Sequence, residues 1–252
     1  MVSTVPPLVY DSDLRKRVRA RLADHDRIEL PLDGRRHAAV AILLVDSELG
    51  DDRVDPHAFD DDDMTKIPGF VPGEEAALDG RMVNVAGGAS FVLCRRPARM
   101  GRHASQWALP GGRLDPGENP IEAALRETHE EVGVEVDESA VLGVLDDYAT
   151  RSGFIMTPVV VWGGPDVVIE PNPGEVLAAY KIGIHHLLRP DSPRYVDIPE
   201  SNRPVVQIPL SGDLIHAPTG AVVLQFRWRC LDGLPSDETR VGDLEQPVFA
   251  WG

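Results

Sequence analysis

Apolar residues in this chain occur in two patterns, which predict two kinds of element. A continuous apolar run typical of a buried strand lies at 37–45, and further strands are predicted at 90–95, 106–109, 141–148, 155–162 and 176–184. Leucine and valine four residues apart predict a helix over 11–24. A second helix is predicted over 218–231, where Pro218 suits the first helical position. A helical turn at 185–194 and a short hairpin strand at 204–210 complete the predicted elements.

The most clearly delimited helix is predicted between Asn119 and Gly133. Asn119 is a favourable N-cap, Pro120 suits the first helical position, and Glu122 is placed to complete a capping box. Gly133 stands where a left-handed C-terminal cap would fall. The face expected to pack on the core repeats at helical spacing and consists of Ile121, Ala124, Leu125, Thr128 and Val132.

The opposite face of this helix is charged. Glu127, Glu130 and Glu131 lie three and four residues apart, so their carboxylates are close enough to repel one another. Arg126 supplies one positive charge, and a divalent cation would supply more. Carboxylate oxygens are hard ligands that suit Mg²⁺ or Mn²⁺. The sequence therefore predicts a divalent-metal site beside the glycine-rich loop that precedes the helix.

These positions, taken with the loop, resemble the Nudix box. The matching residues are Gly112, Glu118, Arg126, Glu127, Glu130, Glu131, Gly133 and Val134. Thr128 departs from the pattern, at a place that is usually apolar. The resemblance implies an α+β fold, a Nudix-type α/β/α sandwich with a mixed β-sheet. We expect a single domain over 1–252, with a helical extension at 1–36 and an acidic loop insertion at 46–88.

The resemblance also implies roles for individual residues. Catalysis would fall to Arg126, Glu127, Glu130 and Glu131. The three glutamates and the carbonyl of Gly111 would hold the metal, and Glu118 would support the loop. The catalytic base is left open between Glu127 and an acid on a later loop such as Glu175.

A basic cluster before the loop bears on the substrate. It consists of Arg95, Arg96, Arg99, Arg102 and His103. Guanidinium groups can hold phosphates bidentately, so Arg95, Arg96 and Arg102 are candidate substrate-binding residues, although such charges also occur simply as loop surface. The stretch is similar to the upstream pattern of coenzyme A pyrophosphatases of the Nudix family. It matches that pattern at Arg96 and departs from it at Cys94, Pro97, Gly101, Ser105 and Leu109.

The implied activity is metal-dependent hydrolysis of a nucleoside diphosphate linked to another moiety, with coenzyme A or an acyl derivative favoured. The departures keep open ADP-ribose, a dinucleotide or a nucleoside triphosphate as the substrate. An alternative from another class is a Nudix domain that binds a nucleotide without cleaving it. The complete set of charged box residues argues against that alternative.

Charge and composition narrow the class of partner. A net charge of −16 over 252 residues disfavours nucleic acid and anionic membrane surfaces as partners. Cys94 and Cys230 offer no disulfide framework, and no apolar run is long enough to span a bilayer, which favours a cytoplasmic protein. The expected partner is a small-molecule nucleotide, and the chain leaves a homodimer open.

Overall fold

The computed structural model describes residues 5–50, 85–96, 106–210 and 213–248. Within these ranges the core is an eight-stranded sheet whose central order is β3-β2-β1-β7-β5. Its strands are β1 (Arg36–Ser47), β2 (Gly88–Arg95), β3 (Trp107–Ala108), β4 (Gly111–Arg113), β5 (Val141–Val144), β6 (Tyr148–Ala149), β7 (Phe154–Trp162) and β8 (Ala178–Gly183). β4 pairs with β1, β6 with β7, and β8 with the outer edge of β2.

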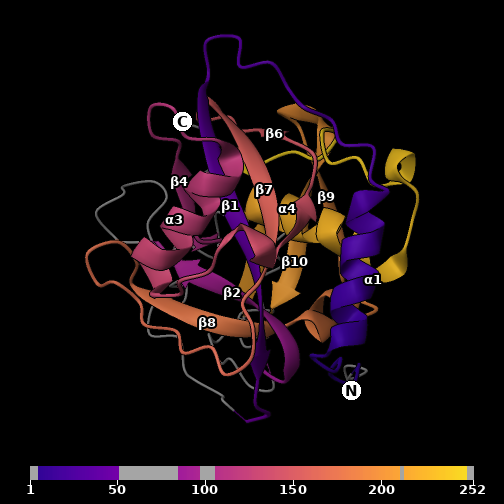
Figure 1. The fold of residues 1–252 in the computed structure, drawn as a ribbon. Helices are drawn as coiled ribbons and strands as arrows, with labels where there is room; N and C mark the ends of the chain where they lie inside the picture. Colours follow the sequence, from indigo (N-terminus) through magenta and orange to yellow (C-terminus); the bar gives the residue numbers. More distant parts are fainter. Residues whose placement is uncertain (1–4, 51–84, 97–105, 211–212, 249–252) are drawn as a thin grey trace.

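The sheet is mixed, as predicted. β1 runs parallel to β7 over 36–44 and 154–162, whereas its pairings with β2 and β4 are antiparallel. Residues 41–45 of β1 are fully buried, which explains why the sequence shows a continuous apolar run there rather than an alternating pattern. β1 therefore forms the centre of the molecule, and the site is built along its edges (Figure 1).

One face of the sheet is covered by α3 (Pro120–Val132), the helix predicted between Asn119 and Gly133 (Figure 1). Asn119 accepts from the backbone N–H groups of Ile121 and Glu122, and the Glu122 carboxylate completes the capping box. Gly133 ends the helix with φ 73°, the left-handed conformation that glycine adopts without strain. The helix packs its small side chains against Leu43, Val92, Val159 and other inward residues of β1, β2 and β7.

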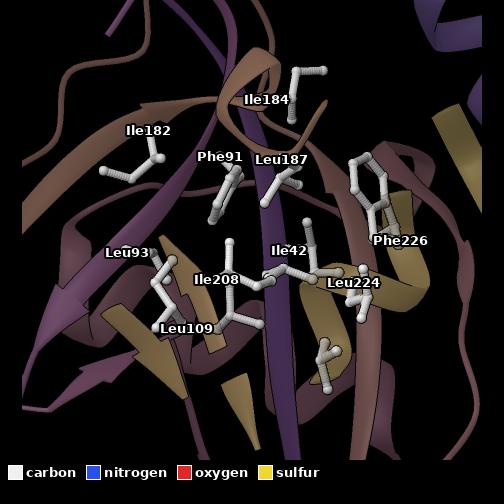
Figure 2. Close-up of a cluster of buried hydrophobic side chains, with 14 of the residues drawn as sticks. Ile42, Phe91, Leu93, Leu109, Ile182, Ile184, Leu187, Ile208, Leu224 and Phe226 are labelled. Atoms are coloured by element: carbon white, nitrogen blue, oxygen red, sulfur yellow. The ribbon is translucent and has the colours of Figure 1, made fainter. Parts of the chain in front are cut away.

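The other face carries the larger core. It is covered by α1 (Ser12–Ala23), α4 (Thr219–Phe226) and a three-stranded sheet of β9 (Arg194–Ile198), β10 (Ser201–Leu210) and β11 (Asp213–His216). Figure 2 shows Ile208 of β10 and Phe226 of α4 in the same buried cluster as Ile42 and Phe91 of the central sheet. This second layer differs from the simple helical layer of the expected sandwich, because a small sheet shares it with the helices.

Several predicted elements take a different form. The run 141–148 is two short strands, because the chain between them turns the buried Asp146 and Asp147 toward His25 and Arg27. The turn expected at 185–194 is a 3₁₀-helix, Ile184–Leu188, followed by β9. The helix expected over 218–231 is α4 continued by a π-helix, Arg227–Asp232.

The remaining expectations concern the insertion, the cysteines and the membrane. β1 extends to Ser47 and β2 begins at Gly88, so most of the expected insertion at 46–88 falls outside the described residues. Cys94 and Cys230 are both buried free thiols. Every helix in the described ranges is too short or too polar to cross a bilayer.

Candidate functional site

Arg126 organises the acidic face of α3. Its Nε donates to Glu118 at 2.8 Å, and its Nη1 donates to Glu127 at 2.8 Å and to Glu130 at 2.9 Å. Its Nη2 also donates to the carbonyl oxygen of Arg113 at 2.9 Å, which ties the helix to β4. One guanidinium thus serves three carboxylates, so the cluster keeps a net negative charge that a cation could offset.

The chain before α3 needs glycine because β1 and Glu127 approach it closely. A Cβ on Gly112 would lie 2.1 Å from Oε1 of Glu127, and a Cβ on Gly111 would lie 2.4 Å from the carbonyl oxygen of Ala39. The N–H of Gly111 donates to Oε2 of Glu131 at 3.1 Å. Gly111 therefore lets β4 lie close to β1, and Gly112 lets it lie against the Glu127 carboxylate.

A later loop brings a further acid to the helix. The N–H of Asn172 donates to the carbonyl oxygen of Glu131, and the N–H of Glu175 donates to the carbonyl oxygen of Asn172, both at 2.9 Å. As a result, carboxylate oxygens of Glu127, Glu130 and Glu175 lie within 4.8 Å of one another. These three residues form the group that could hold a divalent cation. Glu175, foreseen as a candidate base, thus lies beside two of the predicted metal ligands.

Glu131 points into the cavity described below rather than into that group of three, and the ligation by the Gly111 carbonyl stays a prediction. Burial raises the pKa of Glu131 to about 7, and the charge of Glu127 adds to this, while the Gly111 N–H and Arg96 oppose it. Burial also raises the pKa of Glu127, against the hydrogen bond from Arg126. By contrast, the hydrogen bonds from Arg126 lower the pKa of Glu118. Raised carboxyl pKa values beside a cavity are typical of functional sites.

A cavity of about 480 Å³ opens beside these acids. Glu127, Glu131 and Glu175 line one part of it, and Arg96 lies in its wall. Burial lowers the pKa of Arg96, while the charge of Glu131 opposes this. The rest of the lining is largely apolar and aromatic, including Val40, Trp107, Leu109, Phe154 and Met156. A largely apolar hollow with a few charged groups is the usual form of a small-molecule site.

The structure corrects the prediction that Arg95 binds substrate. Arg95 has no exposed surface. Its guanidinium pairs with the carboxylate of Asp213 and lies 3.6 Å from the centre of the Trp107 ring. The indole Nε1 of Trp107 donates to the same carboxylate at 3.0 Å. Arg95 therefore packs behind Trp107, which lines the cavity, and does not line the cavity itself. Arg102, with Arg99 and His103, lies outside the described residues.

Sequence reasoning missed several residues of the cavity. Thr150, Ser152, Thr219 and Gln246 line it together with Arg113. Arg113 sits between the glycines and Glu118 of the box, a position that could have drawn attention to it. The other four come from distant segments, and nothing in their own sequence surroundings marks them as site residues.

Comparison with known proteins finds matches over the same part of the chain. A model of the NUDIX domain matches residues 77–196. "Nudix hydrolase 3" of Caenorhabditis elegans is 37% identical over 112 residues, which cover 43% of this chain and 47% of that protein. An "Uncharacterized Nudix hydrolase NudL" of Photorhabdus laumondii is 36% identical over 110 residues, 43% of this chain and 59% of that protein. The chain thus spans about half the length of the curated relatives it matches.

Among solved structures, a MutT/nudix family protein from Enterococcus faecalis aligns with a TM-score of 0.48 at 13% identity, covering 91% of this chain and 79% of that one. The residues that the NUDIX domain model matches include the glycine loop, all of α3 and Glu175. The sequence match and the box residues on α3 thus identify the same part of the chain. Residues 77–196, which hold the box residues and α3, therefore match the NUDIX domain.

Proposed function

We propose that this protein is a divalent-metal-dependent pyrophosphohydrolase that cleaves a nucleoside diphosphate linked to another moiety, with coenzyme A or an acyl-coenzyme A as its favoured substrate. It would act in the cytoplasm on a small nucleotide. The observation that carries the proposal is the set of carboxylates from Glu127, Glu130 and Glu175, whose oxygens lie within 4.8 Å of one another at the cavity edge.

The donor set fits Mg²⁺ or Mn²⁺, because carboxylate oxygens are the ligands that these hard cations prefer. Glu127, Glu130 and Glu175 would hold the ion, with Glu131 beside them. When bound, the ion would offset charge on the anhydride oxygens and acidify a water. Arg126 fixes the orientation of Glu127 and Glu130 through its hydrogen bonds, so that the acids do not have to reorganise when the substrate binds.

The hydrolysis itself needs a water, a base and an exit for the leaving phosphate. The water oxygen attacks one phosphorus of the anhydride, the bridging P–O bond breaks, and the two products leave as phosphate monoesters. Glu131 is suited to accept the proton from the water, because burial raises its pKa to about 7 and places its basicity near neutral pH. Glu127 and Glu175 are the other carboxylates that line the cavity.

The preference for coenzyme A rests on the resemblance of the stretch before the box to that group, which is carried by Arg96. Arg96 lies in the cavity wall, and the charge of Glu131 acts on it. The apolar part of the cavity offers room for a base or a pantetheine arm. An ADP-ribose or dinucleotide substrate would use the same acids, and it is the alternative within this reaction class.

The test is hydrolysis of coenzyme A, ADP-ribose and NADH with Mg²⁺, followed by mass spectrometry of the products. We expect an adenosine bisphosphate and a phosphopantetheine from coenzyme A, and no product when a chelator is present. Faster turnover of ADP-ribose or NADH would shift the substrate assignment. If none of the three were cleaved and a nucleotide still bound, the domain would be a sensor rather than an enzyme.

A further inference from the structure

A pair of arginines lies at the end of the cavity away from the acids. In the sheet, Arg36 of β1 pairs with Phe154 of β7, and Ala38, two residues further along β1, pairs with Arg113 of β4. Residues two apart on a strand share a face, and directly paired residues do as well. Ala38, Arg113 and Phe154 line the cavity, so the side chain of Arg36 belongs to the same face. Alanine at position 38 leaves space between the two arginines.

Both guanidinium groups gather on the ring of Phe154. The Cζ of Arg36 lies 4.0 Å from the ring centroid, and the Cζ of Arg113 lies 5.6 Å from it. The attraction of a cation for an aromatic ring favours this arrangement and limits the conformations that the two side chains sample. Two hydroxyl groups stand beside them, since Thr150 and Ser152 also line the cavity with their oxygens 3.2 Å apart.

The charge of this arginine pair is not neutralised by the described part of the protein. No described carboxylate forms an ion pair with Arg36 or Arg113, whereas Arg126, Arg151 and Arg203 each pair with at least one glutamate. In a chain of net charge −16, two adjacent unneutralised guanidinium groups at the edge of a cavity are suited to an anionic ligand.

The separation of the two ends of the cavity limits what this anion can be. Gly111, whose N–H donates to Glu131, pairs with Val40 of β1, four residues from Arg36. Four residues of a strand span ~13 Å. An anion held at the Arg36 and Phe154 end of the pair therefore lies about one nucleoside away from the acids, too far to be part of the anhydride that they surround.

We propose that Arg36 and Arg113, seated on Phe154, bind a phosphate of the substrate that is separate from the anhydride being cleaved. This inference rests on the proposed pyrophosphohydrolase function and narrows its substrate class. The favoured substrates are nucleoside diphosphate compounds that carry an additional phosphomonoester on the ribose. Two guanidinium forks can donate several hydrogen bonds to one phosphate, and the neighbouring hydroxyls can add to them.

The test compares paired substrates that differ only in that phosphate. The specificity constant kcat/KM is measured for coenzyme A against 3′-dephospho-coenzyme A, and for NADPH against NADH. The preference for the phosphorylated member of a pair is expected to fall about tenfold in Arg36→Ala and again in Arg113→Ala, as for the loss of a charged hydrogen bond. The preference in the unmodified protein is also expected to shrink as salt is raised. The additional phosphate is attached to different ribose hydroxyls in the two pairs. The pair with the larger preference therefore shows which phosphate position the arginines bind.

Arg17→Ala is the matched control. Arg17 is an exposed arginine of α1, which contributes no residue to the cavity, and its removal changes the net charge equally. The inference is overturned if the unmodified protein shows no preference in either pair, or if its preference survives both substitutions. It is also overturned if Arg17→Ala lowers the preference as much as the other two.

A binding measurement separates this inference from the proposed function. Adenosine 3′,5′-bisphosphate and AMP are titrated by calorimetry, which needs no hydrolysis. Tighter binding of the bisphosphate that is lost in the Arg36→Ala, Arg113→Ala double variant supports the arginine subsite even if no anhydride is cleaved. Equal binding of the two nucleotides overturns the subsite, whereas cleavage of coenzyme A in the same preparation would leave the proposed function intact.

Discussion

The acids of the cavity and the acids of the opposite layer have contrasting surroundings. Beside the cavity, Glu118, Glu127 and Glu130 share the single guanidinium of Arg126, and Glu131 accepts from the Gly111 N–H. In the opposite layer, the single carboxylate of Glu245 accepts from Arg151, Arg203 and Ser201. Hydrogen-bond donors are thus few for the acids beside the cavity and plentiful around Glu245.

The pKa values follow this difference. Burial raises the pKa of Glu131 to about 7, and its hydrogen bond from Gly111 does not offset that. Burial also acts to raise the pKa of Glu245, but the hydrogen bonds from Arg151, the Gln246 N–H, Arg203 and Ser201 outweigh it and lower the pKa to about 2. Asp146 behaves as Glu245 does, because His25 and the Ile28 N–H outweigh its burial and lower its pKa.

The comparison separates two uses of a buried carboxylate. Glu245 and Asp146 hold segments together, since each binds groups more than ninety residues away in the chain. Glu127 and Glu131 are held in place at an energetic cost, which is what a metal or proton site requires. Asp213 is intermediate, because burial raises its pKa although Arg95 and Trp107 bind it.

The largest expected effect is at Glu131. Glu131→Gln should reduce kcat on the cleaved substrate by about a thousandfold or more, because the amide can neither take a proton nor supply negative charge. The free energy of unfolding should hold or rise, since the substitution removes a buried charge. Steady-state kinetics and chemical denaturation measure the two quantities. Glu135→Gln is the control, because it makes the same chemical change at an exposed position. An equal loss of activity in both variants would contradict a specific role for Glu131.

The second effect concerns Glu245. Its pKa is lowered from 4.5 to about 2, so its ion pairs contribute stability that is fully present above pH 4.5. That contribution, about 3 kcal/mol by linkage, is lost as the pH falls toward the folded-state pKa. Glu245→Gln should therefore lower the free energy of unfolding by about that amount at pH 7, and the deficit should narrow as the pH falls.

Guanidinium chloride denaturation at several pH values tests the Glu245 prediction. Glu200→Gln is the control, since Glu200 is an exposed acid near the start of β10. A deficit that stayed constant from pH 7 to pH 3 would mean that the hydrogen bonds of Glu245 do not depend on its charge.

The smallest of the three effects sharpens the picture of the cavity acids. Gly112→Ala would place a methyl group 2.1 Å from Oε1 of Glu127 and should displace that carboxylate. Small misplacements of catalytic groups can cost about a hundredfold in rate, so kcat/KM is expected to fall by up to that factor. Gly242→Ala meets no atom within 4 Å and should leave the rate unchanged. An unchanged rate in Gly112→Ala would show that Glu127 can move without consequence.

The parts of the site that the sequence predicts are those that depend on local structure. Asn119, Glu122 and Gly133 delimit α3 through contacts within a few residues, so its ends could be predicted almost to the residue. The spacing of Glu127 and Glu130 on one helical face follows from the helix alone. The proximity of Glu175 required the hydrogen bonds through Asn172, and only its place in a turn suggested it.

The parts that could not be predicted depend on distant pairing. Arg95 looked like a phosphate ligand because its partner, Asp213, stands 118 residues away, on a strand that the apolar pattern does not reveal. Arg36 reaches the ring of Phe154, which lines the cavity, only because β1 pairs with β7. The three-stranded sheet was missed because β9 and β11 are short and polar residues interrupt their apolar pattern.

The position of β1 has a practical consequence for anyone who trims this chain. β1 precedes the matched residues 77–196, yet it lies between β2 and β7 and carries the register that sets β4. A fragment cut at the matched boundaries would lose its middle strand and leave β2 and β7 with open hydrogen-bonding edges, which invite aggregation. A fragment expressed for study of this site should therefore start upstream of Arg36.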